Sequence, residues 1–321
     1  MPELRTLARG ACLALAVACA ACTSAGSLTP RPPARGPSAM ITVGSFNFPE
    51  SVLLAYLYAD GLAAKGYPVR VVPDLGTREL VDPALMADLI QLVPEYTGSA
   101  LEFVSLGQVR ATASAGTTAS ALATYMAGRG LVIGRPAAAQ DGNAIVVTAA
   151  TAARYRLRTI SDLAQVAARL VFGGPPECPE RAYCLPGLRL VYGLRFREFV
   201  PLDAGGPLTR QALAAGDIGA ALLFTTDPAI QAQHLVALAD NRGLQPAENV
   251  VPVLRRATAS RYGPGLLAAL DAVSARLSTA ALASLDAQVQ LDGQAPQAVA
   301  ERWLRAADLV AAVPDGPGAA S

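Results

Sequence analysis

The sequence predicts an α/β protein in which two successive α/β units precede a helical C-terminal part. Three observations support this prediction. Short apolar strand-like runs alternate with helical segments from residue 41 onward, the alternation begins again near Asn143, and leucines recur at helical spacing after residue 264. The chain has 321 residues, of which 52% are hydrophobic, so it is long enough for one large domain or two medium ones.

The first unit is predicted to contain a mostly parallel sheet, because strands and helices alternate along it. A helix over residues 50–64 has one apolar face, formed by Val52, Tyr56, Ala59 and Ala63. Thr77 is a suitable N-cap for a second helix over residues 78–87. The other elements expected here are strands at 41–43, 69–72, 89–93 and 131–133 and a helix at 118–127, with Pro94 ending the third strand.

The second unit repeats this alternation before the chain becomes helical. Ser161 is a plausible N-cap for a helix that carries Leu163, Val166 and Leu170. The other elements expected here are strands at 144–148, 171–172, 218–224, 235–238 and 250–253 and helices at 188–192 and 207–215. The last helices bury a leucine-rich face that begins with Leu266, Leu270, Val273 and Leu277, continue at Leu282, Leu285 and Val289, and end over 299–309. This pattern leaves open whether the units are independent domains or lobes that exchange chain.

The N-terminus is typical of an exported protein. Arg5 and Arg9 precede an apolar run over residues 11–21, which is too short to cross a bilayer and fits a signal peptide over residues 1–21. Residues 22–39 are mostly Ser, Gly, Pro and Ala and are predicted to form a flexible tether. A disordered tail is expected over residues 314–321.

Cys22 resembles the lipidated cysteine of bacterial lipoproteins, because the small residues Ala20 and Ala21 precede it. Cys19 is a second candidate for lipidation, and a plain secretory signal is the alternative to both. We therefore expect a lipoprotein at the outer face of the cell membrane, held there by its lipid anchor alone. Cys178 and Cys184 remain in the mature chain, and a disulfide is the simplest interpretation of such a pair in an oxidising compartment.

Several functions are disfavoured by composition. The formal net charge is +1 and no stripe of Lys and Arg is present, so we expect no nucleic-acid partner. His234 is the only histidine, which disfavours a His-based catalytic triad and makes zinc binding by the cysteine pair less favourable than a disulfide. No glycine-rich nucleotide motif and no acidic cluster with metal spacing is found. The sequence therefore predicts a protein that is not an enzyme and needs no cofactor or metal.

A set of short motifs resembles the glycine betaine/carnitine/choline-binding proteins of osmoprotectant ABC transporters. The motifs occur in the order of that family and cover the chain from Ile41 to about Leu309. They are ITVGSxxFxE at 41–50, LGT at 75–77, VPEYTGS at 93–99, PPECPER at 175–181, CLPG at 184–187, LFTTD at 223–227 and NVVPV at 249–253.

The resemblance implies a two-lobed, periplasmic-binding-protein-like fold of type II with a ligand cleft between the lobes. Lobe one would comprise residues 40–140 and 249–313, and lobe two residues 141–248. The implied function is the extracytoplasmic solute-binding component of an importer. Such a protein binds an osmoprotectant such as glycine betaine or choline and delivers it, as a monomer, to the permease subunits for transmembrane transport. Lobe closure around the ligand would be a hinge motion.

The resemblance also implies the ligand-binding residues. Family ligands carry a quaternary ammonium group, which is recognised by aromatic faces because it cannot donate a strong hydrogen bond. Tyr96 and Phe224 match cage aromatics, Arg181 matches a carboxylate-binding arginine, and Ser99 offers a hydroxyl. The full predicted set is Ser45, Phe46, Asn47, Thr77, Tyr96, Thr97, Ser99, Asn143, Arg181, Phe224 and Glu248.

Two departures from the family pattern affect which ligand is expected to bind. Asn143 and Glu248 stand where relatives place tyrosines, so fewer rings would surround a cation. These residues suit a polar or polyphenol-like ligand, while Glu248 would also neutralise a cation such as choline. A ligand-sensing surface lipoprotein that is not coupled to transport would have the same fold. Asp203 to Gly206 resembles an anion-binding helix start, but Asp203 disfavours an anion and we interpret the segment as a turn.

Overall fold

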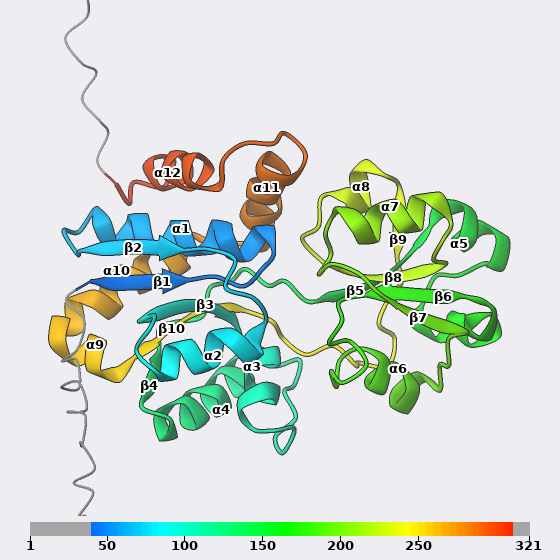
Figure 1. Cartoon of the computed structure of the whole chain (residues 1–321), viewed down its shortest axis with the longest axis horizontal. Helices are drawn as coiled ribbons and strands as arrows, with labels where there is room; N and C mark the ends of the chain where they lie inside the picture. Colours follow the sequence, from blue (N-terminus) through cyan, green and yellow to red (C-terminus); the bar gives the residue numbers. More distant parts are fainter. Residues whose placement is uncertain (1–39, 311–321) are drawn as a thin grey trace, which may run out of the picture. The chain divides into compact units, whose positions relative to one another are not determined.

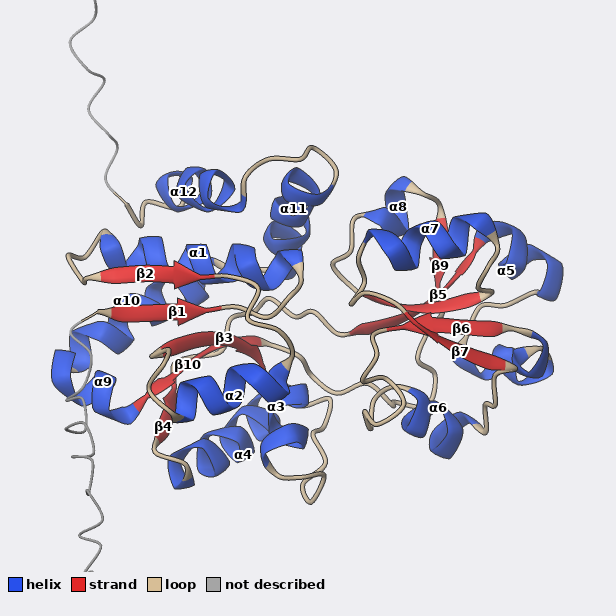
Figure 2. Ribbon diagram, in the orientation of Figure 1, coloured by secondary structure: helices blue, strands red, loops and turns tan. Residues whose placement is uncertain are grey.

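A computed structural model describes residues 40–310, which form two five-stranded sheets, each with helices on both faces (Figures 1 and 2). We call the first sheet and its helices lobe one, and the second sheet and its helices lobe two. The predicted signal peptide (1–21), tether (22–39), lipidation site at Cys22 or Cys19 and C-terminal tail (314–321) lie outside the described residues. The two sheets and their helices confirm the predicted α/β class.

The sheet of lobe one has the strand order β2-β1-β3-β10-β4. Its strands are β1 (Ile41–Gly44), β2 (Val69–Val72), β3 (Leu92–Tyr96), β4 (Leu131–Ile133) and β10 (Val250–Arg255). Strand β1 is parallel to β2 and β3, whereas β10 is antiparallel to both of its neighbours. The prediction that Pro94 ends a strand was wrong. Pro94 lies inside β3 opposite Pro252 of β10, so the two residues that lack an N–H face each other in the ladder.

Helices cover both faces of this sheet and create two cores. They are α1 (Pro49–Ala63), α2 (Arg78–Met86), α3 (Thr97–Val104), α4 (Ala115–Gly128), α9 (Arg256–Tyr262), α10 (Pro264–Arg276), α11 (Thr279–Gln290) and α12 (Pro296–Ala306). Residues of α1 pack with those of α10, α11 and α12 in one core. The predicted buried face of α1 was only partly right, because Tyr56 is half-buried and Ala63 is exposed. Three helices surround α1, so 11 of its 15 residues are buried and no single face dominates.

The sheet of lobe two has the order β7-β6-β8-β5-β9. Its strands are β5 (Asn143–Thr148), β6 (Val171–Gly174), β7 (Glu198–Pro201), β8 (Ala220–Phe224) and β9 (Leu235–Ala237), of which the sequence did not reveal β7. The helices are α5 (Ala149–Tyr155), α6 (Leu185–Tyr192), α7 (Pro207–Ala215) and α8 (Ala229–Ala232), with 3-10 helices at Ile160–Gln165 and Ala167–Arg169. The prediction that Ser161 is a helix N-cap was wrong, because Ser161 lies inside the first 3-10 helix. Thr159 is the residue that precedes this helix, and its N–H donates to Asp162 at 2.8 Å.

The chain crosses between the sheets twice, and the strand that follows each crossing is the antiparallel one. Strand β5 opens lobe two and β10 returns to lobe one. The two crossing segments pair with each other through a bridge between Gln140 and Asn249, and Asp141 N–H donates to the Glu248 carbonyl at 3.1 Å. This arrangement fixes Asp141 and Glu248 where both lobes begin.

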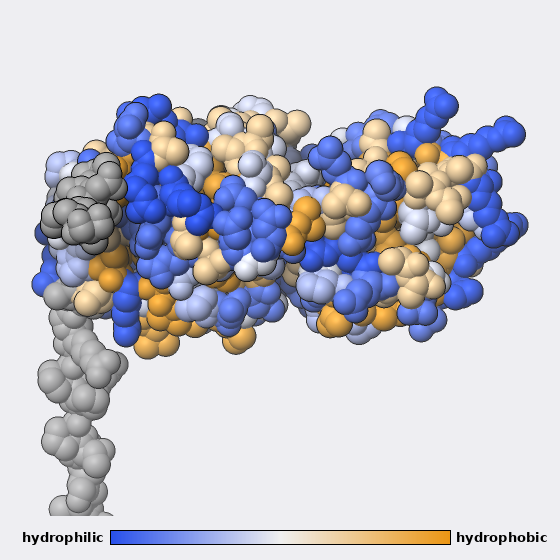
Figure 3. All heavy atoms as spheres, turned by 90° about the horizontal axis from the view of Figure 1, so that it is seen from above, coloured by the Kyte–Doolittle hydropathy of each residue, from blue (hydrophilic) through white to orange (hydrophobic). Residues whose placement is uncertain are grey.

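Among residues 40–310, no single helix is long and apolar enough to cross a bilayer. Only α10 and α11 taken together have sufficient length and hydrophobicity, and the pair is bent by 86°. Figure 3 shows that hydrophilic and hydrophobic residues are interspersed on one face of the molecule.

Candidate functional site

A cavity of about 120 Å³ is lined by residues from both lobes. Nine of the eleven residues predicted to bind ligand line it: Phe46, Asn47, Thr77, Tyr96, Ser99, Asn143, Arg181, Phe224 and Glu248. Ser45 and Thr97 do not. Both are fully buried, and their hydroxyls bond backbone groups instead: Ser45 accepts from Asp74 N–H at 2.9 Å, and Thr97 donates to the Ala247 carbonyl at 3.1 Å. These two residues therefore shape the loops that carry the lining, and that the other nine bind a ligand stays a prediction.

Aromatic side chains form one continuous group along the cavity. Phe48 is its centre, with ring centroids 6.0 Å from Phe46, 6.1 Å from Tyr96 and 5.4 Å from Phe224. The Phe46 and Phe48 rings are nearly parallel, at 8°. Phe224 comes from the end of β8 and the others from lobe one, so the contact between Phe48 and Phe224 joins the two lobes. Phe48 belongs to the same motif as Phe46, and the resemblance places it at a cleft-facing loop, but it was not included in the predicted set of binding residues.

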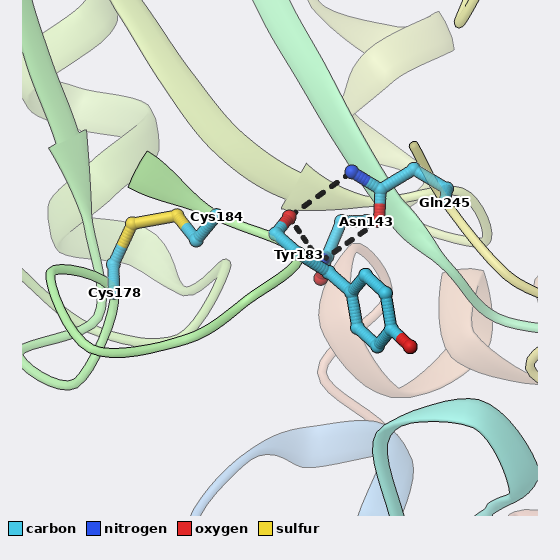
Figure 4. The surroundings of a disulfide bond; sticks show 5 residues. All are labelled: Asn143, Cys178, Tyr183, Cys184 and Gln245. Carbon is cyan, nitrogen blue, oxygen red and sulfur yellow. Dashed lines mark hydrogen bonds between the residues drawn. A yellow bond between two sulfur atoms is a disulfide. The ribbon is translucent and has the colours of Figure 1, made fainter. Parts of the chain in front are cut away.

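Tyr183 is a fifth lining aromatic, and the predicted disulfide holds its loop. Cys178 and Cys184 are bonded, with Cα atoms 5.3 Å apart (Figure 4). The Tyr183 carbonyl accepts from Asn143 Nδ2 at 3.1 Å and from Gln245 Nε2 at 3.0 Å, while its hydroxyl accepts from Ala111 N–H at 3.2 Å. Asn143 thus uses its amide nitrogen on the protein. It therefore helps to position the loop that carries the Tyr183 ring.

Glu248 is buried at the N-terminus of α3. One carboxylate oxygen accepts from Gly98 N–H at 2.9 Å and Ser99 N–H at 3.0 Å, and the other accepts from the Ser99 hydroxyl at 2.5 Å. Burial raises the pKa of Glu248 to about 7, although the bonds from Ser99 and the charge of Arg78 act in the opposite direction. The Glu248 carboxyl group therefore caps the N-terminus of α3 and is also part of the cavity wall.

Both arginines of the cavity wall have carboxylate partners. Arg78 makes two bonds of 2.8 Å to Glu95, and its guanidinium lies 5.1 Å from the Phe46 ring centre. Arg181 donates to Glu79 at 2.7 Å, which joins lobe two to α2 of lobe one, and it lies 5.5 Å from the Phe103 ring centre. The sequence indicated Arg181 but not Arg78, because a buried ion pair across 17 residues leaves no local pattern.

A second group of acids lies beside the cavity, where α1, α11 and the crossing segment meet. Glu50 accepts from the Tyr96 hydroxyl and from the Thr226 hydroxyl, both at 2.6 Å, and the second bond joins the lobes. Asp141 accepts from Thr226 N–H at 3.0 Å. Asp286 is fully buried, and neither of its oxygens has a donor among the described residues.

Burial raises the pKa of each of these acids. The pKa of Glu50 lies well above its ordinary value, first because it is buried and then because Asp286 is close. Burial likewise raises the pKa of Asp141, and it raises that of Asp286 to about 7. Burial and the neighbouring carboxyl groups therefore both disfavour the ionised forms within this group.

Another polar contact between the lobes contains the buried ion pair of Arg210 and Asp227. Arg210 of α7 donates to Asp227 at 3.1 Å and to Gln290 of α11 at 2.9 Å, which again joins lobe two to lobe one.

Asp203 accepts from the N–H groups of Leu208 and Thr209 at 2.9 Å, so it caps the N-terminus of α7 and is more than the turn that the sequence predicted. No three or more His, Cys, Asp or Glu side chains within residues 40–310 are arranged to hold a metal ion.

Two α/β lobes joined by paired crossing segments, with a ring-lined cavity between them, define a solute-binding protein. The comparisons name its family. Residues 39–306 match the family described as the substrate binding domain of the ABC-type glycine betaine transport system, and the chain belongs to it. The predicted resemblance and the transport-related class are therefore confirmed.

Known relatives agree with this assignment. A glycine-betaine-binding protein of Pseudomonas aeruginosa is 28% identical over 276 residues, which cover 83% of this chain and 87% of that protein. The glycine betaine-binding protein YehZ of Escherichia coli is 26% identical over 274 residues, 83% of this chain and 90% of its own length. The solved structure of a glycine betaine/carnitine/choline ABC transporter matches with a TM-score of 0.66 at 21% identity, over 84% of this chain and 99% of that one. This last match confirms the predicted two-lobed fold.

Proposed function

We propose that this protein binds a small quaternary amine in the ring-lined cavity and delivers it to the permease of an ABC importer. The observation that carries the proposal is the group of aromatic rings around Phe48, in which rings of lobe one contact Phe224 of lobe two at the cavity wall. A quaternary ammonium offers no strong hydrogen-bond donor, and several ring faces are the surface that attracts it. Glycine betaine and choline are the two representative ligands.

The geometry also suits closure around a solute. Side-chain bonds that join the lobes in this structure include Thr226 to Glu50, Arg181 to Glu79, Arg210 to Gln290 and Tyr183 to the backbone of Ala111. Each ring face near the cation contributes about 0.5–2 kcal/mol, with the larger values in dry sites. A ligand that touches rings of both lobes therefore favours the state in which those bonds are made.

The finer points of export belong to the same proposal. The signal peptide and the lipid at Cys22 would keep the monomeric protein at the outer face of the cell membrane, next to the permease subunits. No chemical step is proposed, because the protein's task is to bind and release the solute unchanged. Mass spectrometry of the protein from cells tests the anchor: a lipidated Cys22 is expected, and an unmodified N-terminus after signal removal would contradict it.

Titration calorimetry with glycine betaine and choline tests the binding function. We expect saturable binding of at least one of them. Phe48→Leu should weaken that binding about tenfold or more, because it removes the ring that contacts three others. Tyr125→Leu is the matched control, since this half-buried tyrosine of α4 is not part of the cavity wall.

Binding that is equally strong in Phe48→Leu would remove the rings from the site. If neither amine binds while a polyol or a polyphenol does, the proposed ligand class is wrong although the binding function stands.

A further inference from the structure

The N-terminus of α3 is an anion site that the protein fills itself. Backbone N–H groups at the start of a helix attract anions, because they have no partner within the helix and lie at the positive end of its dipole. In α3 the Gly98 and Ser99 N–H groups both point to Glu248, at 2.9 and 3.0 Å. A carboxylate on a solute would have to displace Glu248 to use these donors.

The surrounding chain keeps Glu248 in this place. Thr97 donates its hydroxyl to the Ala247 carbonyl at 3.1 Å and accepts from Asn249 N–H at 3.1 Å, so it bonds both neighbours of Glu248. The approach is also close. A Cβ atom on Gly98 would lie 2.5 Å from Pro246 and 3.0 Å from the Glu248 carboxyl carbon, so only glycine fits there. Glu248 is thus a fixed part of the wall and not a mobile side chain.

The cavity wall offers no free cation in place of the filled helix end. Four acids line it, Glu102, Asp141, Glu177 and Glu248, against two arginines. Each of these arginines is already paired, Arg78 with Glu95 and Arg181 with Glu79. Among the described lining residues, the carboxylate of a solute would therefore meet only acids and arginines that already have carboxylate partners.

From this geometry we infer that the pocket selects an organic cation without a carboxylate of its own, and that Glu248 is the counter-charge that makes this selection. The inference rests on the proposed function and narrows its ligand class. Choline and glycine betaine are the matched probes, since both carry a trimethylammonium group and differ in a hydroxyl against a carboxylate. The rings would serve both headgroups equally, whereas Glu248 attracts the choline cation and repels the betaine carboxylate.

The test is titration calorimetry of the purified full chain at pH 8 with each probe. We expect choline to bind at least tenfold more tightly than glycine betaine. In Glu248→Gln the choline affinity should fall at least tenfold and that of glycine betaine should stay or rise, so that the preference is lost. Glu180→Gln is the control, because this exposed acid lies in the same loop as the disulfide but not in the wall.

A measurement on the natural protein avoids any folding defect of the variant. Lowering the pH from 8 to 5.5 should reduce the ratio of choline to betaine affinity at least severalfold, because protonation removes the counter-charge. Equal or tighter betaine binding at pH 8, or a preference that Glu248→Gln leaves unchanged, overturns this inference and leaves the proposed function standing. Failure of both probes to bind overturns the two together.

Discussion

Asp286 is predicted to destabilise the folded protein above neutral pH, and Asp286→Asn should therefore stabilise it. The side chain is fully buried beside Glu50 and Asp141, and burial raises its pKa from 3.8 to about 7. Between these two values the folded protein holds a proton that the unfolded chain has lost, so the free energy of unfolding falls as the pH rises. A difference of about 3 pH units at about 1.4 kcal/mol per unit corresponds to about 4 kcal/mol.

The neutral amide removes this loss and can still donate a hydrogen bond to Glu50. We expect Asp286→Asn to raise the free energy of unfolding by about 4 kcal/mol at pH 8, by about 2 kcal/mol at pH 5 and hardly at all at pH 4. Urea unfolding followed by circular dichroism at these three pH values measures the difference. The control is Asp292→Asn, which changes an exposed acid two residues beyond the end of α11 and should have no effect.

Two results would refute the reasoning. A gain of the same size at pH 8 and pH 4 would mean that the amide stabilises by packing and not by relieving a buried charge. A loss of stability at pH 8 would mean that the ionised Asp286 makes a favourable interaction in the folded protein.

Three further predictions concern the cavity wall. Replacing Cys178 and Cys184 by serine should lower the free energy of unfolding by about 2 kcal/mol, as expected for a loop with a sequence separation of 6, and reducing agent should do the same to the natural protein in thermal melts. Arg181→Ala removes the bond to half-exposed Glu79 that joins the lobes; we expect less than about 1 kcal/mol of stability loss and weaker solute binding by calorimetry, because the closed state loses this bond, and unchanged affinity would show that the bond does not contribute to closure. Tyr183→Leu should weaken amine binding severalfold because it removes a ring from the cavity wall, and it should also lower the melting temperature because the buried Ala111 N–H loses its acceptor; a lower melting temperature with normal affinity would assign the ring to packing.

The sequence predicted the fold well because local patterns determine its elements. Helix α7 was predicted with its observed bounds, since Pro207 is suited to the first turn and Gly216 takes the left-handed conformation at its end. Strand β7 was missed, as its residues are half-exposed and alternate weakly. Pro94 does not end β3, because a proline opposite another proline removes no ladder bond that its partner needs.

The site was less predictable where contacts are distant in sequence. Glu248 was predicted to line the cleft where relatives have a tyrosine, but its bonds to α3 span 149 and 150 residues, so no local pattern revealed them. Two features of the sequence do point to Tyr183 and Asp286. Tyr183 is an aromatic residue next to Cys184 within the constrained loop, and Asp286 interrupts the apolar stripe of α11 four residues after Leu282. A charged residue in a buried stripe indicates a polar group that needs its own partners.

Burial raises the pKa of both Glu248 and Asp286 to about 7, so the ionisation of either group lowers the free energy of unfolding as the pH rises, but their positions give them different roles in ligand binding. Glu248 lines the cavity, so its ionisation creates a counter-charge and the affinity for a cation rises with pH. Asp286 lies beside the bond between Glu50 and Thr226, so its ionisation adds repulsion where the lobes meet and stability falls over the same range. Because a cation bound near Glu248 also stabilises the closed protein by mass action, the loss of stability at high pH should be smaller with choline present than without it. A pH profile of unfolding in the two conditions therefore separates the charge that recognises the solute from the charges that weaken the contact between the lobes.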